Sequence, residues 1–319
     1  MQSGSTLVTG AAGFAGAHLL KHLSRTAPNQ PLQGWARTIS RPSDTHANIH
    51  WCGVDMLDAA AVSRAIAAHP PSEIYHLAGA SHTGASWQRP AAYLEIHVSG
   101  THHLLEAVRA HAPACRVLVV SSGMIYRPQD YAVTEEAPLG PVSPYALSKL
   151  AEDQLAIYAA QHDDLDIVVA RPFNHIGPGQ APTFAASSFA RQIAEIECGA
   201  KPASIAVGNL EAARDLTDVR DVVAAYTALM RLGRRGIGYN VCRGEAVRMS
   251  ALLDQLLALS NTQVQLEQDA ERLRPNDIPF LAGDPTRIHT ETGWTPQIPL
   301  KQTLTDLLNH WRASLADTR

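Results

Sequence analysis

Thr9-Gly10-Ala11-Ala12-Gly13-Phe14-Ala15-Gly16 places three glycines at intervals of three residues, directly after a short apolar run, Ser5–Thr9. An amphipathic stretch, Phe14–Ser24, follows, so the order is strand, turn and helix, as in units that bind dinucleotides. The first glycine permits a tight turn, the second lets the backbone approach a pyrophosphate, and the third allows the helix to pack closely on the strand. The helix N-terminus adds free N–H groups and a positive dipole end. This segment therefore predicts a dinucleotide site near the start of the chain.

The first half of the chain continues with alternating strand and helix patterns. We expect strands over residues 5–9, 31–36, 49–54, 73–78, 116–121 and 166–170, and helices over 14–24, 59–69 and 90–110. Such alternation is typical of a parallel sheet covered by helices on both faces, with ligands at the carboxyl ends of the strands. The predicted fold class is α/β, a Rossmann-type doubly wound parallel sheet with a smaller C-terminal substrate-binding lobe.

The pattern changes after Pro172, where a loop-rich stretch begins. Beyond it we expect helices over 184–197, 217–232, 250–259 (capped by Ser250) and 300–315, a short helix opened by Asp284-Pro285, and a strand over 238–241. We therefore assign residues 1–172 to the cofactor-binding domain, to which residues 215–244 return, and residues 173–214 and 245–319 to the substrate-binding lobe.

The composition argues against several classes of partner. The chain of 319 residues has 26 basic and 30 acidic residues, a net charge of −4 and no polycationic block, so neither nucleic acid nor an anionic membrane is expected. No apolar run reaches about 18 residues and no signal-peptide pattern opens the chain, which favours a cytoplasmic protein. The four cysteines are widely spaced, as expected for reduced, mostly buried thiols. No metal is expected, because His18/His22 and His102/His103 have no carboxylate or thiolate at ligand spacing.

A second motif, Tyr145-Ala-Leu-Ser-Lys149, places a phenol and an ammonium four positions apart, on one face of a helix. The ammonium favours the ionised form of the phenol, so the pair can transfer a proton. Ser143 can cap this helix and Pro144 suits its first position. We therefore assign Tyr145 as an acid or base and Lys149 as the group that tunes it.

The residue that follows the second strand bears on the choice of cofactor. An acidic residue there would bind the ribose diol of NAD, but the sequence is Trp35-Ala36-Arg37, and a guanidinium suits the extra phosphate of NADP. NADP(H) is therefore preferred, with NAD(H) as the alternative. Asp55, after the third strand, could receive the adenine amino group or merely cap the next turn. The other expected cofactor contacts are Gly10, Ala12, Gly13, Phe14, Ala15, Gly16, Met56, Leu77, Ala78, Gly79, Tyr145 and Lys149.

Four motifs together resemble the extended short-chain dehydrogenase/reductase superfamily: Thr-Gly-x-x-Gly-x-x-Gly, Leu77-Ala78-Gly79, Ser121-Ser122 at a strand end, and Tyr-x-x-x-Lys. The resemblance spans nearly the whole chain. It implies that Tyr145 is the catalytic acid or base, that Lys149 also hydrogen-bonds the nicotinamide ribose, and that Ser122 holds the substrate oxygen. Tyr126-Arg127 departs from the family pattern, in which a glycine usually follows the tyrosine, and this touches the loop conformation rather than the chemistry.

Motifs in the second half look like the nucleotide-sugar branch of this superfamily that handles GDP-mannose derivatives. They are Ser187–Ile193, Val207–Asp215, Arg274–Asp277, Gly283–Pro285 and Thr292–Trp294. The resemblance implies that Arg214 and Arg274 bind the diphosphate or the adjacent ribose, because a forked cation suits these anionic groups. It also implies that Asn174 donates to a diphosphate or sugar oxygen, and that Asn209 and Arg191 lie near the nucleotide. A surface ion pair is the alternative for each arginine.

One position separates the reactions of this branch. Its dehydratases carry a glutamate two residues after the catalytic Ser or Thr, whereas here Ser122 is followed by Gly123 and Met124. A thioether cannot act as a general base, so elimination loses its proton acceptor and hydride transfer to a carbonyl remains. The resemblance therefore implies NADPH-dependent reduction of the 4-keto group of GDP-4-keto-6-deoxy-D-mannose to give GDP-D-rhamnose.

Three other functions stay open. They are an NAD-dependent nucleotide-sugar 4-epimerase, a GDP-mannose 4,6-dehydratase and a non-catalytic NADP-binding regulator. The resemblance also implies a homodimer, formed through helices around residues 97–110 and 145–160.

Overall fold

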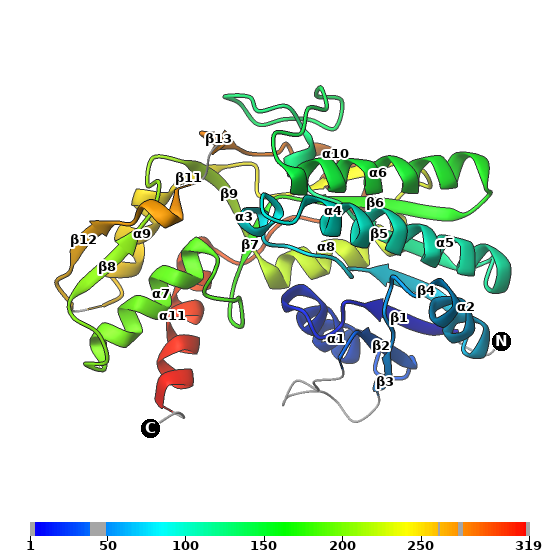
Figure 1. The fold of residues 1–319 in the computed structure, drawn as a ribbon, viewed down its shortest axis with the longest axis horizontal. Helices are drawn as coiled ribbons and strands as arrows, with labels where there is room; N and C mark the ends of the chain where they lie inside the picture. The colour runs from blue at the N-terminus through cyan, green and yellow to red at the C-terminus, as the bar shows by residue number, and fades with distance from the viewer. Residues whose placement is uncertain (1–3, 39–48, 261, 274–276, 317–319) are drawn as a thin grey trace.

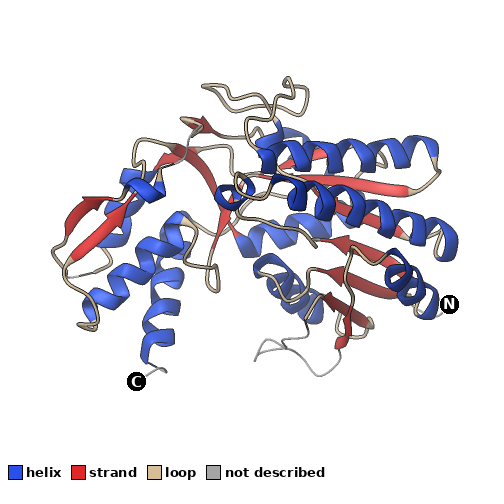
Figure 2. Cartoon of the chain, viewed as in Figure 1, coloured by secondary structure: helices blue, strands red, loops and turns tan. Residues whose placement is uncertain are grey.

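The protein consists of a larger half built on a parallel sheet and a smaller half that contains the C-terminus (Figure 1). The computed structural model describes residues 4–38, 49–260, 262–273 and 277–316. In Figure 2 the larger half shows strands between layers of helices, and the smaller half is mainly helical with short strands at its edges.

Seven parallel strands form the sheet of the larger half, in the order β10-β6-β5-β4-β1-β2-β3. Their bounds are β1 Ser5–Thr9, β2 Leu32–Ala36, β3 Ile49–Gly53, β4 Pro71–His76, β5 Arg116–Val120, β6 Asp166–Pro172 and β10 Gly238–Val241. The strand order reverses direction between β1 and β4, and the crevice at such a point is where doubly wound sheets bind ligands. The predicted Rossmann-type sheet is confirmed, with every expected strand of the first half within two residues of its expected start and end.

Helices cover both faces of this sheet. One face carries α2 (Ala59–Ala68), α5 (Gly100–His111) and α6 (Pro144–His162), and the other carries α1 (Phe14–Thr26) and α8 (Val219–Leu232). Along β1 the side chain of Leu7 packs into the first core and that of Val8 into the second. This two-sided burial explains why the strands are continuous apolar runs rather than alternating patterns.

The helix expected over residues 90–110 is interrupted. It consists of α4 (Pro90–Leu94), a π-helical turn over Glu95–Ser99 and α5. A π-turn accommodates an extra residue within a helix, and such turns often occur at functional sites. Here the turn carries His97, which is fully buried and faces the residues around Lys149.

The smaller half has a core of its own. Helices α7 (Ala185–Glu197), α9 (Met249–Leu257) and α11 (Leu300–Ala316) enclose a cluster that includes Phe189, Leu252 and Leu304. Six short strands lie beside them and were not expected. They are β7 Asn174–Ile176, β8 Ser204–Val207, β9 Ala213–Asp218, β11 Ala246–Arg248, β12 Gln265–Gln268 and β13 Phe280–Leu281.

Two expected helix starts were wrong. The helix expected from Thr217 begins at Val219, because Thr217 still belongs to β9 and Asp218 caps α8 by accepting the Arg220 N–H. The helix expected to be capped by Ser250 begins one residue earlier, so Ser250 lies inside its first turn. The short helix expected near residue 285 is α10 (Thr286–Thr292), which packs against α8 and β10 and thus lies with the larger half.

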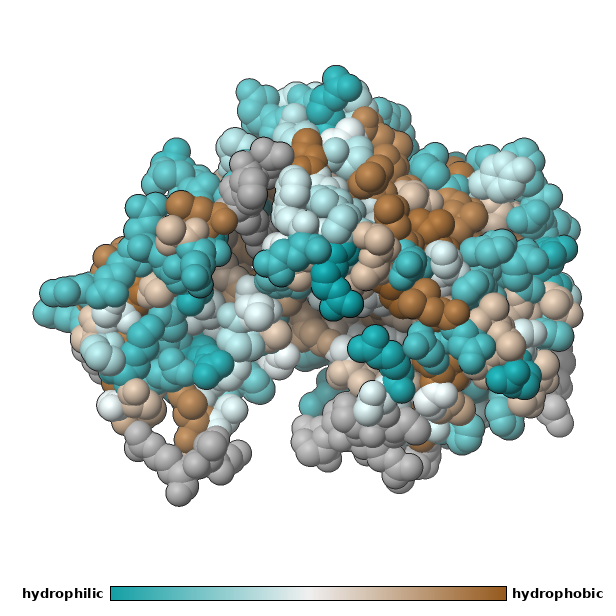
Figure 3. Space-filling view, in the orientation of Figure 1, coloured by the Kyte–Doolittle hydropathy of each residue, from teal (hydrophilic) through white to brown (hydrophobic). Residues whose placement is uncertain are grey.

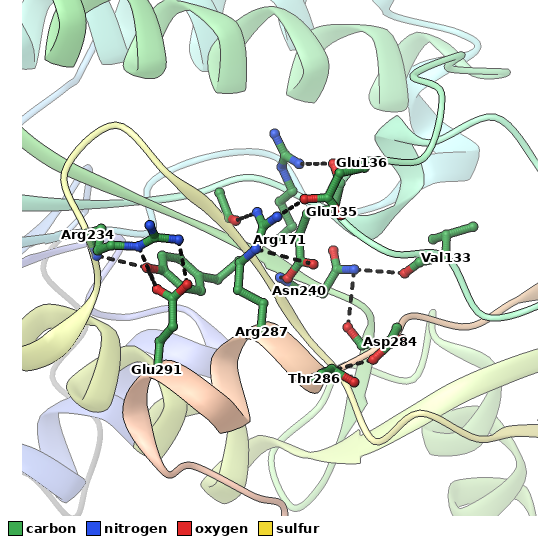
Figure 4. Close-up of polar contacts among 12 residues, drawn as sticks. Val133, Glu135, Glu136, Arg171, Arg234, Asn240, Asp284, Thr286, Arg287 and Glu291 are labelled. Carbon is green, nitrogen blue, oxygen red and sulfur yellow. Dashed lines mark hydrogen bonds and ion pairs between the residues drawn. The ribbon is translucent and has the colours of Figure 1, made fainter.

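A buried polar network joins β6, β10 and the loop that precedes α6 (Figure 4). The Arg171 guanidinium donates to both carboxylate oxygens of Asp153 at 2.9 Å and to the Tyr126 hydroxyl at 2.9 Å. Tyr126 in turn donates to the side chain of Asn240, whose backbone N–H donates to Glu135. The network therefore holds in place the long loop between the β5 end and α6.

All four cysteines are thiols outside any disulfide, with Cys115 and Cys242 buried and Cys52 and Cys198 half-buried. Within the described residues, no helix is long and apolar enough to cross a membrane. Nor does the described part of the chain contain a cluster of three or more His, Cys, Asp or Glu side chains placed to hold a metal ion.

Candidate active site

In the turn after β1, glycine stands where a side chain would collide with the backbone or cover the helix start. Gly10 has φ of 66°, and a Cβ on it would lie 2.8 Å from the backbone of Leu77 and Ala78. A Cβ on Gly16 would collide with the Gly10 carbonyl oxygen. Gly13 is the N-cap of α1 and offers no side chain to the first-turn N–H groups, which leaves them for a ligand. The turn therefore fits a dinucleotide pyrophosphate.

Thr9 ties this turn to the next ligand-binding loop. Its hydroxyl accepts the N–H groups of Leu77 and Ala78 at 3.2 and 3.1 Å and contacts His76 Nδ1 at 2.8 Å. Leu77, Ala78 and Gly79 follow β4, the strand beside β1 at the reversal of strand order. The predicted cofactor residues of both segments thus lie next to one another at the carboxyl ends of β1 and β4.

The other predicted cofactor residues follow β2 and β3. Arg37 comes directly after β2, and its side chain is exposed. Asp55 is also exposed, and its Oδ1 accepts the Leu57 N–H at 3.0 Å, which is the turn-capping role weighed above. Met56 is buried and packs near Gly100.

Ser122 and Tyr145 lie at the carboxyl end of β5 and in the first turn of α6. Ser122 is 6% exposed, and its Oγ accepts the Met124 N–H at 3.1 Å, which leaves its own proton free to donate to a substrate oxygen. As predicted, α6 begins at Pro144 with Ser143 as its cap. The ring of Tyr145 is half-buried and makes edge-to-face contacts with Tyr93 and His97, at centroid distances of 6.3 and 5.9 Å.

Lys149 lies one turn further along α6, over the end of β5. Its Nζ donates to the Val120 carbonyl at 2.9 Å and to Glu152 Oε2 at 2.6 Å. A Cβ on Gly79 would lie 3.6 Å from this Nζ, so the loop after β4 passes directly over the ammonium. Lys149 is therefore between the two strand ends that border the predicted nicotinamide site.

Two buried histidines beside Lys149 are neutral. Burial, with a smaller effect of the Lys149 charge, lowers the pKa of His97 to about 2 and that of His76 to about 3. Ala80 N–H donates to His97 Nε2 at 3.1 Å, so the ring proton is on Nδ1, which donates to Ser148 Oγ at 2.8 Å. Sequence reasoning missed these residues, since nothing in the pattern showed that His97 would point inward from a π-turn.

Met124 lies where a dehydratase would need its glutamate. It belongs to a 3-10 turn, Gly123–Ile125, and its sulfur accepts a hydrogen bond from the Thr83 hydroxyl at 3.7 Å. Thr83 opens the short helix α3 (Thr83–Ser86), which is capped by His82. The hydroxyl and thioether fill this position with groups that cannot remove a proton from carbon.

Apart from Ser122, the predicted substrate residues that the structure describes fall in the smaller half or at its junction with the sheet. Figure 3 shows a hollow between the two halves. Asp277 brings two of the substrate residues together, because its carboxylate accepts from Arg214 Nη2 at 2.7 Å and from Asn209 Nδ2 at 2.8 Å. Asn174 is exposed at the start of β7. Arg191 is on α7, where it pairs with Glu195 at 2.7 Å and contacts the Trp311 ring. Arg274 lies outside the described residues.

Comparisons with known proteins show similarity over almost the whole chain. Residues 7–307 match the family described as GDP-mannose 4,6 dehydratase. The chain is 34% identical to a GDP-6-deoxy-D-mannose reductase of Pseudomonas aeruginosa, over 97% of this chain and 98% of that protein. It is 27% identical to UDP-glucose 4-epimerase 2 of Oryza sativa subsp. japonica, over 96% of this chain and 81% of that protein. A solved structure of RMD from Pseudomonas aeruginosa complexed with NADPH is 32% identical, with a TM-score of 0.85, over 98% of this chain and 99% of that one.

The glycine turn, the positions of Ser122, Tyr145 and Lys149 at the end of β5 and the start of α6, and these similarities over almost the whole length of the chain lead to one conclusion. The chain belongs to the GDP-mannose 4,6 dehydratase family and is an oxidoreductase-type enzyme of the extended short-chain dehydrogenase/reductase class.

Proposed function

We propose that the protein uses NADPH to reduce the 4-keto group of GDP-4-keto-6-deoxy-D-mannose, giving GDP-D-rhamnose. The observation that carries this proposal is the presence of Ser122 at the end of β5 and of Tyr145 and Lys149 in the first two turns of α6, with Met124 at the position of the dehydratase base. Tyr145 can donate a proton to a carbonyl oxygen, whereas the Met124 thioether cannot remove a proton from carbon. The similarity to the Pseudomonas aeruginosa reductase points to the same substrate.

The proposed reaction divides the work among three side chains. When bound, the reduced nicotinamide supplies the hydride, which is the chemistry of the cofactor. Tyr145 protonates the ketone oxygen, and Ser122 donates a hydrogen bond to the same oxygen with the proton that its contact with Met124 leaves free. Lys149 presents a positive charge beside Tyr145 and binds the nicotinamide ribose.

We propose NADP(H) as the preferred cofactor because Arg37 lies exposed at the end of β2, where a guanidinium can bind a ribose phosphate. The Pseudomonas aeruginosa neighbour was solved with NADPH. NAD(H) remains the alternative, and relative kcat/KM with NADPH and NADH measures the preference directly.

For the substrate we propose that Arg214 and Arg274 bind the diphosphate or ribose, that Asn174 donates to a diphosphate or sugar oxygen, and that Asn209 and Arg191 lie near the nucleotide. The contacts of Asp277 with Arg214 and Asn209 support this set, because they orient two of its members together. The forked donors of a guanidinium also match phosphate oxygens, which suits Arg214 to this role.

We also propose a homodimer formed through α4, α5 and α6. Exposed apolar side chains on these helices support it, with Leu94 38%, Leu147 50% and Tyr158 58% exposed, and Figure 3 shows apolar residues gathered over this region. A second copy of the chain would cover them. Light scattering during size-exclusion chromatography should give a dimer for the wild type and a monomer for Leu147→Glu.

We place the enzyme in the cytoplasm, a reducing compartment that suits four cysteines outside any disulfide.

The second candidate is a 4-epimerase, favoured by the similarity to the rice UDP-glucose 4-epimerase. Both functions use the same three catalytic side chains, but only the reductase consumes a reduced cofactor stoichiometrically. We would incubate the protein with NADPH and a panel of 4-keto nucleotide sugars, follow the loss of NADPH absorbance and identify the product by NMR. NADPH consumption with a GDP-linked rhamnose product supports the reductase, and interconversion of UDP-hexoses without NADPH consumption supports the epimerase.

A further inference from the structure

A chain of buried polar side chains leads from Lys149 to the glycine turn. Glu152 lies one turn after Lys149 on α6 and is fully buried. Its Oε2 accepts from Lys149 Nζ at 2.6 Å, and its Oε1 accepts from the Thr101 hydroxyl at 3.0 Å. Thr101 also contacts His76 Nε2 at 3.0 Å, and His76 Nδ1 contacts the Thr9 hydroxyl at 2.8 Å. Five elements, β1, β4, β5, α5 and α6, meet in this network.

With Glu152 ionised, each proton in this network has one place. Thr101 gives its single hydroxyl proton to Glu152, so His76 Nε2 must donate to Thr101. His76 Nδ1 then accepts the proton of Thr9, whose oxygen accepts the two N–H groups of the loop after β4. The carboxylate is thus held in one orientation by donors on both sides. A fully satisfied buried network of this kind has one low-energy arrangement.

The titratable groups around Lys149 indicate a specific role for Glu152. The titratable groups that face Lys149 are His76 from β4, His97 from the π-turn, and Tyr145 and Glu152 from α6. The two imidazoles are neutral, and the carboxylate of the next acid on α6, Asp153, accepts two hydrogen bonds from Arg171. Burial raises the pKa of the Glu152 carboxyl, and the Lys149 ammonium at 2.6 Å and the Thr101 hydroxyl oppose that effect by favouring the charged form. Among these groups, Glu152 is the acid in direct contact with the Lys149 ammonium, whose side chain is only 10% exposed.

We propose that Glu152 is a positioning residue for the reaction: held by Thr101 and His76, it keeps Lys149 protonated and fixed beside Tyr145. The same network ties the position of Lys149 to Thr9 and so to the dinucleotide turn. This inference rests on the proposed function only in giving Lys149 its part in proton transfer. A purely structural ion pair is the competing explanation, since a buried pair need not contribute to activity.

The test compares Glu152→Gln with Asp153→Asn, a matched variant at the next buried acid of the same helix. Glu152→Gln keeps the shape and the hydrogen-bond acceptor but removes the charge. We expect kcat to fall by roughly ten- to hundredfold, the scale of a misplaced catalytic group. We also expect the alkaline limb of the kcat/KM profile to move to lower pH by about one unit or more, because the buried ammonium loses its counter-charge. Asp153→Asn should lower the melting temperature and leave this limb where it is in the wild type.

A threonine pair tests the hydrogen bond that holds the carboxylate. Thr101→Val replaces the hydroxyl with a methyl group of similar shape and should lower kcat in the same direction as Glu152→Gln, by a smaller factor. Thr101→Ser restores the hydroxyl and should recover most of that loss. A role limited to packing would give the opposite order, because valine fills the site better than serine.

A direct titration separates this inference from the proposed function. The chain has four lysines, Lys21, Lys149, Lys201 and Lys301, so NMR of protein labelled with isotope at the lysine side chains gives few signals, and Lys149→Arg assigns the relevant one. The Lys149 signal should lose its proton at a pH at least about one unit lower in Glu152→Gln than in the wild type. This holds even if no 4-keto sugar is reduced, an outcome that would reject the function alone. An unchanged titration in folded Glu152→Gln, or an equal change in Asp153→Asn, would overturn the inference.

Discussion

Replacing Tyr145 with phenylalanine removes one oxygen from the candidate active site and leaves its packing intact. The edge-to-face contacts of the ring with Tyr93 and His97, at 6.3 and 5.9 Å, do not involve the hydroxyl. Ser143 still accepts the Ala146 N–H and caps α6. Because the ring keeps its neighbours, we expect the melting temperature and the Kd for NADPH to stay close to the wild-type values.

Turnover should respond very differently. Without the phenol, the oxygen that receives charge during hydride transfer keeps the hydrogen bond from Ser122 but has no proton donor. A positioned general acid contributes about two to four orders of magnitude, which corresponds to about 2.7–5.5 kcal/mol of transition-state stabilisation. In steady-state assays of NADPH consumption with a GDP-linked 4-keto sugar, kcat and kcat/KM should fall together, since the interaction is made only in the transition state.

Tyr93→Phe is the matched control. It also removes one phenol oxygen from this aromatic cluster, but that hydroxyl donates to the His82 carbonyl at 2.6 Å. A lost neutral hydrogen bond is worth about 1 kcal/mol, so kcat should stay within about tenfold of the wild type. A Tyr145→Phe enzyme that retains turnover within tenfold, or equal losses in both variants, would refute the assignment of Tyr145 as proton donor.

Three further predictions concern the cofactor, the substrate and acid stability. Arg37→Ala should raise the KM for NADPH about ten- to hundredfold, the value of a charged hydrogen bond, and leave the KM for NADH nearly unchanged in the same assay. Arg214→Ala should raise the KM for the nucleotide sugar by a similar factor with a small change in kcat, because the side chain binds and does not react. Since His76 and His97 are neutral when folded but take up protons when unfolded, the free energy of unfolding should be greatest above pH 6.5. It should fall by about 1.4 kcal/mol per histidine per unit as the pH drops from 6.5 towards 3, and denaturant titrations of His97→Gln should show a shallower fall.

The fold of the larger half was predictable because its signals are local. Runs of apolar residues marked the buried strands, and Ser143-Pro144 marked the start of α6 within one residue. The glycine turn could be recognised because its positions favour glycine. Gly10 has φ of 66°, and Gly13 caps α1 without a side chain. The spacing of Tyr145 and Lys149 likewise follows from the helical repeat.

The short strands of the smaller half had no such signal. β13 has two residues and β7 and β11 have three each, too few for a periodic pattern, and they form because neighbouring segments supply their hydrogen-bond partners. The contacts of Asp277 with Arg214 and Asn209 likewise join residues 63 and 68 positions apart. No local pattern can indicate such a pairing.

Residue types and spacings were therefore enough to indicate the chemistry of the site. They showed a dinucleotide turn, a phenol with an ammonium one helical turn away, and a thioether in place of a general base. The environment of the ammonium was not accessible in the same way. Glu152 is three residues from Lys149 and could have been noticed, but its burial, the neutral state of His76 and the bond through Thr101 depend on strands and helices meeting from distant parts of the chain. Burial and long-range contacts set the charge of such groups, and they exist only once the chain has folded.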